Sequence, residues 1–304
     1  MKNRSEPDTA ALQAAQLHGL AAGESSRPAN PDWTIPQGWE NYTAEDHGVW
    51  KTLFERQTAL LPGRACDEFV HGMTDLPMGA HEIPDFRRLS DALMERTGWQ
   101  VVAVPGLVPD EVFFEHLAHR RFPAGQFIRK PHQLDYLQEP DVFHDVFGHV
   151  PLLMNPVIAD YIQAYGQGGL RALQLGKLPC LARVYWYTVE FGLVRQPEGL
   201  RIYGAGIASS RAETVFSIDD PSPNRIGFEL ERVMRTLYRI DDFQETYFVL
   251  DSLDELLGLA HIDFAPLYER VGAQSELQPG TVLPTDNVLH QGSGNYHAQH
   301  RGGA

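Results

Sequence analysis

Residues 140–151 read PDVFHDVFGHVP, and this stretch places two histidines, His144 and His149, among mostly apolar neighbours. Burying an imidazole ring without a hydrogen-bond partner costs free energy, so both rings need a reason to be there. Positions five apart in a regular α-helix lie about 140° apart around its axis, so the two rings do not share one face. Gly148 and Pro151 are residues at which a helix ends or bends. We therefore expect a helix that ends at Gly148 and lets His149 turn toward His144.

A third polar residue stands in an apolar helix further along the chain. In LARVYWYTVEFGLV, residues 181–194, Glu190 is the only acidic residue, and an unpaired carboxylate there is strongly disfavoured. An ion pair with Arg183 is one alternative, although the two lie about two helical turns apart. Histidines satisfied by backbone hydrogen bonds are another. Two histidines and one carboxylate are, however, the ligand set of the facial triad of non-haem iron(II), which leaves coordination positions open.

Two other motifs resemble functional sites less closely. Glu115, His116 and His119 form EHxxH, and these histidines share a helix face. The arginine pair that begins at Arg120 favours a solvated outer surface over a ligand set. The glycines of YGAG, residues 203–206, lack the full pattern and the lysine of a phosphate loop, so we expect a tight turn there.

Composition limits the classes of function. The chain has 304 residues, 43% of them hydrophobic, and a formal net charge of -15, which fits a soluble globular protein and repels nucleic acid and anionic lipid. No apolar run approaches the roughly 20 residues of a membrane-spanning helix, and the first residues do not resemble a secretory signal. Two cysteines, Cys66 and Cys180, rule out a disulfide framework. We expect a cytoplasmic protein that binds neither nucleic acid nor membrane.

The ends of the chain differ in composition from its middle. Residues 1–32 are rich in Ala, Ser, Pro and Gln, so we expect a disordered N-terminal tail. Residues 274–304 are rich in Gly and Gln and weakly hydrophobic, so we expect a mobile C-terminal tail. His290, His297 and His300 fall in this second tail, where solvated side chains are the simplest interpretation.

Helical signals dominate residues 33–273, which we expect to form one catalytic domain. Caps, apolar spacing and helix breakers predict helices at 43–61, 84–97, 109–121, 156–169, 179–194 and 224–236. Strand candidates are few and short, at 99–104, 201–203 and 213–218. No repeat and no alternation of strands with helices indicates a doubly wound sheet. The expected architecture is therefore a mainly helical α+β domain.

Three segments in chain order carry a resemblance to a known family. They are PDVFHDVFGHVPLL (140–153), YWYTVEFGL (185–193) and IYGAGIASS (202–210). Together they closely resemble the catalytic domain of the aromatic amino acid hydroxylases, especially the bacterial members that act on phenylalanine. The resemblance implies a basket-like, mainly helical fold with few strands.

The resemblance extends from about Tyr42 to Tyr268 and implies an activity. The expected reaction is hydroxylation of L-phenylalanine to L-tyrosine in phenylalanine catabolism. It uses dioxygen, a mononuclear iron(II) and a tetrahydropterin cosubstrate. His144, His149 and Glu190 fall on the family's iron ligands and are the expected catalytic residues.

The resemblance also assigns a pterin site and a substrate site. The expected pterin contacts are Gly106, Leu107, Asp110, Phe113, Ala182 and Tyr185. The expected substrate contacts are Arg129, Trp186, Phe191, Ser209 and Ile240. Arg129 would hold the substrate carboxylate with its planar guanidinium group. Trp186 and Phe191 would wall the substrate ring.

Departures from the animal members bear on these assignments. Leu137 replaces a threonine that contacts the carboxylate, and Asp145 replaces a glutamate beside the pterin. There is no room for the animal regulatory domain before residue 40 and no C-terminal heptad helix, so we expect a monomer. An apolar Ile240 offers nothing to a phenol hydroxyl, which predicts a preference for phenylalanine over tyrosine. The alternatives are hydroxylation of tryptophan or tyrosine, a zinc hydrolase on the same ligands, and a non-enzymatic regulatory protein.

Overall fold

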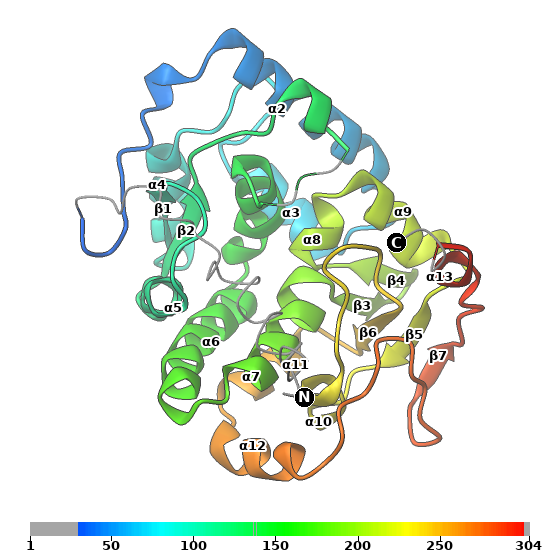
Figure 1. The fold of residues 1–304 in the computed structure, drawn as a ribbon. Coiled ribbons are helices and arrows are strands. Elements are labelled where there is room, and N and C mark those ends of the chain that lie inside the picture. The colour runs from blue at the N-terminus through cyan, green and yellow to red at the C-terminus, as the bar shows by residue number, and fades with distance from the viewer. Residues whose placement is uncertain (1–29, 136, 138, 301–304) are drawn as a thin grey trace, which may run out of the picture.

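The computed structural model describes residues 30–135, 137 and 139–300, and Figure 1 shows its helices surrounding two small sheets. The 20-residue helix α6 (Pro156–Leu175) runs beside α5 (Asp110–Ala118). This mainly helical α+β arrangement confirms the predicted fold class. Among the described residues, no helix combines the length and the apolar character needed to cross a bilayer.

Side-chain caps determine where several helices begin. α2 (Ala44–Leu60) begins with a capping box, in which the Thr43 hydroxyl accepts from the Asp46 N–H at 3.2 Å and the Asp46 carboxylate accepts from the Thr43 N–H at 3.0 Å. Asp85 caps α4 (Phe86–Arg96), and Asn155 caps α6. The other α-helices of the described residues are α3 (Asp67–Asp75), α7 (Leu178–Tyr185), α8 (Ala205–Ala208), α9 (Arg211–Asp219), α10 (Leu230–Arg235), α11 (Asp254–Ala260), α12 (Phe264–Gly272) and α13 (Asn295–His300). The helices predicted to begin near residues 43 and 84 are confirmed.

The smaller sheet contains a connection that the sequence pattern did not indicate. β1 (Gln100–Val104) pairs in parallel with β2 (Arg121–Gly125), and α5 forms the crossover between them. β1 confirms the strand predicted at 99–104. β2 has the sequence RFPAG, and its proline and glycine concealed the strand.

The larger sheet has five strands in the order β4-β3-β6-β5-β7. Its strands are β3 (Leu193–Gln196), β4 (Gly199–Ile202), β5 (Asn224–Gly227), β6 (Thr246–Leu250) and β7 (Val288–His290). β3 and β5 lie parallel to β6, whereas β4 and β7 pair antiparallel at the edges. β4 includes most of the strand predicted at 201–203.

The structure corrects three predicted elements. The strand predicted at 213–218 is wrong because these residues lie in α9, which begins where the Ser210 hydroxyl accepts from the Glu213 N–H. The helix predicted at 179–194 is α7 followed by a wider turn and then β3. The helix predicted at 224–236 divides into β5 and α10, because the residues of NRIG pair with β6.

The C-terminal segment is packed on the domain rather than mobile over residues 274–300. β7 pairs with β5, and the His297 side chain, only 3% exposed, bonds the Phe243 carbonyl at 2.8 Å. Tyr296 packs against Phe243 with ring centroids 5.1 Å apart. A few aromatic and aliphatic side chains therefore hold this segment on the domain, although its average composition is polar. The prediction that His297 is solvated is wrong.

The predicted N-terminal tail falls almost entirely outside the described residues. Only residues 30–32 of it are described, and Asp32 pairs with Arg121 at 3.2 Å. The Asp32 carbonyl also bonds the His116 ring at 2.8 Å. The end of the predicted tail therefore contacts the domain.

A buried acid lies between α9 and the larger sheet. The Glu213 carboxyl group, 6% exposed, accepts hydrogen bonds from the Tyr247 hydroxyl and from the Gln244 N–H at 3.4 Å. Burial raises the pKa of Glu213 to about 7. The folded protein therefore holds a proton on this group that the unfolded chain releases near its ordinary pKa of 4.5.

This difference predicts a dependence of stability on pH. Between about pH 5 and pH 7 the folded state binds more protons at Glu213 than the unfolded state, so the group lowers the free energy of unfolding as the pH rises. Glu213→Gln removes the titration, and its unfolding free energy should fall less across this range than that of the wild type. Urea titrations at several pH values measure it, with the exposed Glu40→Gln as control. Parallel pH profiles for Glu213→Gln and the wild type would contradict the expectation.

Candidate metal centre

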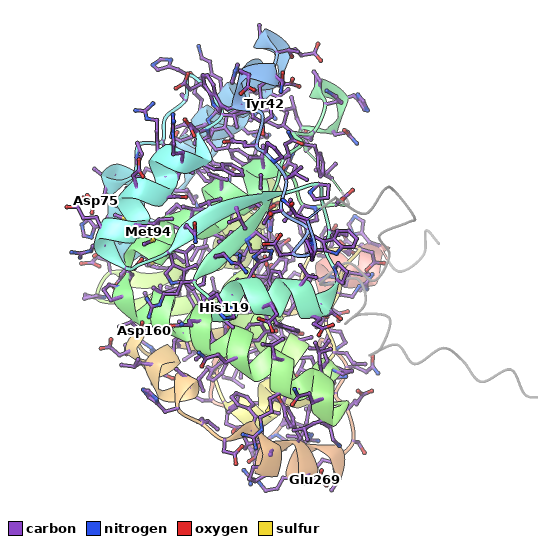
Figure 2. All side chains as sticks on the ribbon, turned by 90° about the vertical axis from the view of Figure 1, so that its left-hand side faces the viewer. Tyr42, Asp75, Met94, His119, Asp160 and Glu269 are labelled. Atoms are coloured by element: carbon purple, nitrogen blue, oxygen red, sulfur yellow. The ribbon has the colours of Figure 1, made fainter. Side chains whose placement is uncertain are left out.

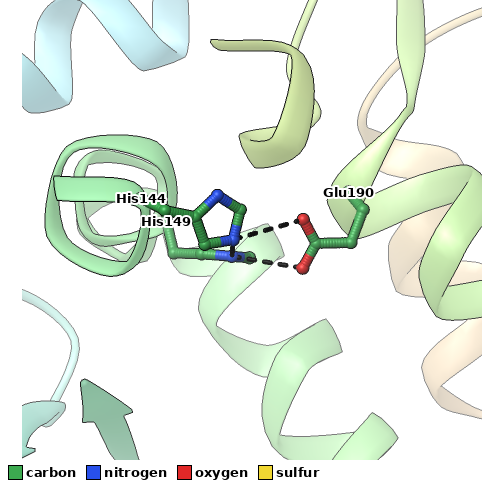
Figure 3. A group of neighbouring side chains, drawn as sticks. All are labelled: His144, His149 and Glu190. Atoms are coloured by element: carbon green, nitrogen blue, oxygen red, sulfur yellow. Dashed lines mark hydrogen bonds and ion pairs between the residues drawn. The ribbon is translucent and has the colours of Figure 1, made fainter. Parts of the chain in front are cut away.

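The structure brings together the three side chains of the predicted triad, as Figure 3 shows. Nε2 of His149 lies 3.3 Å from Nε2 of His144 and 3.2 Å from a carboxylate oxygen of Glu190. Nε2 of His144 lies 3.6 Å from the second carboxylate oxygen. Three ligand atoms about 2.1 Å from one metal ion, and roughly at right angles, lie about 3 Å apart. The three residues therefore fit a facial set on a divalent metal.

Both ligand segments are wound as π-helices. One is η3 (Phe143–His149) and the other is η5 (Trp186–Glu190). A π-helix bonds residues five apart, so His144 and His149 point to one side without a break in the helix. The expected helix end at Gly148 is therefore wrong, because the wider turn continues through Gly148 to His149.

The short helix α8 supports both π-helical turns from behind. A Cβ atom on Gly148 would lie 2.9 Å from the Ala205 carbonyl oxygen, so η3 approaches α8 at backbone distance. A Cβ atom on Gly206 would lie 3.1 Å from the Glu190 carbonyl oxygen. The YGAG turn thus begins a helix whose small residues admit both ligand segments.

The close approach at Gly148 predicts a loss of stability. Gly148→Ala should lower the free energy of unfolding by about 1–3 kcal/mol, because a methyl group pushes η3 away from α8. Gly48→Ala is the matched control: Gly48 lies in α2 with open space around it, so alanine there should raise stability by about 0.5–1 kcal/mol. Denaturant unfolding compares the two variants. Equal effects would show that the contact with α8 is not tight.

Ser209 determines which nitrogen of His144 carries the proton. The Ser209 hydroxyl donates its single hydrogen to the Ala205 carbonyl at 2.8 Å, so it accepts from Nδ1 of His144 at 2.9 Å. Nε2 of His144 is then unprotonated in the neutral ring and faces the other two ligands. Burial lowers the pKa of His144 to about 4, so the ring is neutral at pH 7, which is the form that binds metal.

The contacts contradict both simpler explanations of these side chains, which are an ion pair between Arg183 and Glu190 and histidines satisfied by backbone hydrogen bonds. Arg183 does not pair with Glu190, because its guanidinium donates to the Met234 carbonyl and to Glu276. The Nε2 atoms of the two histidines face each other rather than backbone carbonyls. The arrangement brings three metal-binding side chains together at one point.

The EHxxH segment does not form a second site. His119 lies at the surface of the face shown in Figure 2, where it pairs with Glu115 at 3.4 Å. His116 is fully buried, so the prediction of a solvated surface is wrong for it. Among the described residues, only the triad brings three metal-binding side chains together.

Arg129 lies beside the triad in a buried ion pair. Its guanidinium group donates to both carboxylate oxygens of Asp141, at 2.9 and 2.8 Å. The same carboxylate accepts from the His144 N–H at 3.1 Å, so the pair also holds the first turn of η3. Asp141 is not among the predicted site residues, although PDVFH shows an acid next to an apolar run.

The aromatic residues assigned to the substrate ring lie together. Trp186 and Phe191 have ring centroids 4.7 Å apart. Tyr238, which is not among the predicted site residues, stacks on Trp186 at 4.2 Å with the planes 14° apart. Ile240 is 40% exposed and is not a core residue.

Two of the aromatic residues assigned to the pterin extend from the triad through ring contacts. The Tyr185 ring lies nearly parallel to the His149 ring at 6.5 Å, and Phe113 packs edge-on to Tyr185 at 6.0 Å. Asp110 is buried, one of its oxygens has no hydrogen-bond partner, and burial raises its pKa to about 6. A buried carboxyl group with an unused oxygen suits a ligand that carries N–H groups, as a pterin does. Nearby, Asp145 does not point at the triad's metal position but accepts from the Gly125 N–H at 2.7 Å.

The other residues assigned to the pterin site are Ala182, Gly106 and Leu107. Ala182 is buried in α7 one turn before Tyr185 and Trp186. Gly106 and Leu107 follow β1, and the Leu107 N–H donates to Glu139 at 3.3 Å. A Cβ atom on Gly106 would lie 2.5 Å from the same Glu139 side chain. This loop is therefore held against the Glu139 side chain.

Comparison with known proteins identifies the class. A model of the biopterin-dependent aromatic amino acid hydroxylases matches residues 34–264, and the chain belongs to this family. Its relatives include the phenylalanine-4-hydroxylase of Caulobacter vibrioides, 65% identical over 268 residues that cover 88% of this chain and 91% of that protein. The phenylalanine-4-hydroxylase of Ralstonia nicotianae is 61% identical, with 90% of this chain and 88% of that protein covered.

Solved structures of phenylalanine hydroxylase from Chromobacterium violaceum share the fold. The structure with bound iron(III) and 7,8-dihydrobiopterin superposes with a TM-score of 0.83 at 55% identity, covering 94% of this chain and 100% of that chain. The structure with iron and phenylalanine gives a TM-score of 0.82 at 54% identity, with coverages of 93% and 100%. The family and the fold inferred from the three sequence segments are confirmed.

The convergence of the triad's side chains predicts where a metal binds. Replacing His144, His149 or Glu190 by alanine should reduce the iron that the protein retains after anaerobic loading. The reduction should be well over the roughly 10–100-fold expected for a supporting residue. His119→Ala, an exposed histidine on α5's C-terminus, is the control and should retain iron. Elemental analysis after desalting measures iron per protein. Full iron occupancy in Glu190→Ala would sink the ligand assignment.

Proposed function

We propose that this protein hydroxylates L-phenylalanine to L-tyrosine, using dioxygen, iron(II) and a tetrahydropterin. The observation that carries the proposal is the convergence of the partly buried His144 and Glu190 with the buried His149, with a neutral imidazole on His144 whose Nε2 faces the other two. Relatives of 65% and 61% identity that are phenylalanine-4-hydroxylases support it. So do structural relatives that bind iron, dihydrobiopterin and phenylalanine.

His144, His149 and Glu190 would hold the metal ion. Bound iron and reduced pterin together supply the electrons that activate dioxygen. Glu190 brings one negative charge to two positive ones, so the site keeps a net positive charge. Ser209 keeps the Nδ1 proton of His144 in place, and the apolar residues around η3 exclude water.

The substrate binds between charged and aromatic groups. Arg129 is proposed to bind the amino acid carboxylate, with Asp141 fixing the plane of its guanidinium group. Trp186 and Phe191 are proposed to wall the ring. Phe113, Tyr185 and the loop at Gly106 and Leu107 are proposed to hold the pterin, with Asp110 offering its unused oxygen.

Two further expectations accompany this proposal. Ile240 offers no polar group, so phenylalanine should be preferred over tyrosine, whose buried hydroxyl would lack a partner. We propose that the protein acts in the cytoplasm as a monomer. Its acidic net charge disfavours nucleic acid and anionic membranes as partners.

Arg129 offers a test of the substrate site. Arg129→Lys keeps the charge and loses the planar fork, so KM for phenylalanine should rise by roughly tenfold or more. KM for the tetrahydropterin should change much less, and the iron content should stay near that of the wild type. Steady-state kinetics with each substrate varied in turn measure both constants. An unchanged KM for phenylalanine would contradict the role of Arg129.

The direct test of the function is a reconstituted reaction. The protein is loaded with iron(II) without oxygen, then given a tetrahydropterin, phenylalanine and oxygen, and tyrosine is measured by chromatography. Tyrosine should form only when all components are present, and zinc(II) in place of iron(II) should abolish it. Faster turnover of tyrosine or tryptophan than of phenylalanine would overturn the substrate assignment.

A further inference from the structure

A buried glutamine outside the assigned residues contacts the proposed ring pocket. Gln244 is 2% exposed and lies just before β6. Its side-chain oxygen accepts from the Trp186 indole N–H at 2.9 Å, and its side-chain nitrogen donates to the Arg239 carbonyl at 2.7 Å. Its backbone N–H donates to the buried Glu213. One residue thus connects the aromatic wall, the chain before β6 and α9.

The orientation of the Gln244 amide is fixed by its neighbours. Its nitrogen faces two carbonyl oxygens, those of Arg239 at 2.7 Å and Asp242 at 3.5 Å. Its oxygen faces two N–H groups, those of the Trp186 indole and of the Arg239 backbone at 3.4 Å. A flipped amide would place oxygen against oxygen and nitrogen against N–H. Only one orientation satisfies the pocket.

Trp186 has one polar group, and Gln244 binds it. The faces and edges of the indole are contacted by Tyr238 at 4.2 Å and Phe191 at 4.7 Å, which are apolar contacts that permit sliding. The hydrogen bond to Gln244 is the directional contact that selects one rotation of the indole. Without it, a poorly solvated N–H group would lack a partner, at a cost that favours other ring positions.

The same amide holds the chain that carries Ile240. It bonds both the N–H and the carbonyl of Arg239, the residue before Ile240, and approaches the carbonyl of Asp242. Gln244 therefore fixes Trp186 relative to residues 239–242. Trp186 and Ile240, both assigned to the substrate ring, are thus held relative to each other through one amide.

We infer that Gln244 is a positioning residue that sets the size of aromatic side chain accepted by the pocket. It acts through Trp186 and the 239–242 segment and favours a single six-membered ring over a bicyclic one. This inference rests on the proposed function, because it concerns the substrate of that reaction. A glutamine that only stabilises the fold would affect stability without affecting ring preference.

The contact itself is testable without turnover. The chain has five tryptophans, so the 15N-labelled, zinc(II)-loaded protein should give five indole N–H resonances, and Trp186→Phe identifies the one from Trp186. In Gln244→Met that resonance should move upfield and its proton should exchange faster with solvent. The other four should stay in place. An unmoved Trp186 resonance would overturn the inference.

Ring preference is tested by the ratio of kcat/KM for tryptophan to that for phenylalanine. Gln244→Met should raise this ratio roughly threefold to tenfold, the range that loss of one net hydrogen bond produces. In a Trp186→Phe background the same change should have less than about twofold effect, because its target is gone. An unchanged ratio, or an equal effect in both backgrounds, would refute action through Trp186.

Gln163→Met is the matched control. Gln163 also uses both ends of its amide, donating to the Ala118 carbonyl at 3.0 Å and accepting from Arg120 at 2.8 Å, between α5 and α6. It should lower Tm as Gln244→Met does and leave the ratio unchanged. If both variants change the ratio alike, general loosening explains the effect and the inference fails.

Two further outcomes also bear on the inference. If Gln244→Met does not fold, Gln244→Glu replaces it: a buried, protonated glutamate keeps an acceptor for the indole and a donor for Arg239, so the Trp186 resonance and the ratio should stay near wild type. Loss of either would count against the inference. A wild-type protein that forms no tyrosine would refute the proposed function, while the indole resonance would still decide whether Gln244 positions Trp186.

Discussion

The constraint on which this structure depends is the convergence of three polar side chains, two imidazoles and a carboxylate, on one point of the protein. Such groups repel one another and lose hydration when buried, so the surrounding chain must hold them. Two π-helical turns supply the ligands, and α8 touches both. The wider turn matters because it places His144 and His149 on one side while the helix stays continuous. Single-turn π-helices are common at functional sites for this kind of reason.

Each ligand turn is held at its first residues by a buried polar side chain. Asp141, paired with Arg129, accepts the His144 N–H at the start of η3. Gln244 accepts the indole N–H of Trp186 at the start of η5. Buried polar groups like these add little net stability, but they define one geometry when every member is satisfied. Ligand geometry and pocket shape are thus controlled by the same contacts.

The sequence predicted the structural features that depend on local pattern. It did not predict the features that depend on contacts between distant parts of the chain. Thr43, Asp46 and Pro84 marked helix starts because capping and proline signals are local. Glu190 was found because an isolated acid in an apolar helix is conspicuous. The continuation of η3 through Gly148 was not predictable, since it depends on the approach of α8.

Other failures have the same cause. The strand predicted at 213–218 lies in α9, because burial of Glu213 and Phe216 against distant segments outweighed a β-like pattern. His116 looked solvated beside two arginines, yet it is buried under residue 32, which no local pattern indicates. No sequence pattern indicated a role for Gln244, because the role of this loop glutamine depends on its contact with the Trp186 indole.

The packed C-terminal segment has a consequence for how the domain avoids self-association. β7 covers the outer edge of β5, and an uncovered strand edge is a template for pairing with another chain. Tyr296 and His297 also cover the rings of Phe216 and Phe243 and bond the chain just before β6. A fragment that ends at residue 273 would expose the strand edge of β5 beside the uncovered rings of Phe216 and Phe243. The composition that makes residues 274–300 look expendable thus conceals the part of the chain that keeps this sheet from joining another.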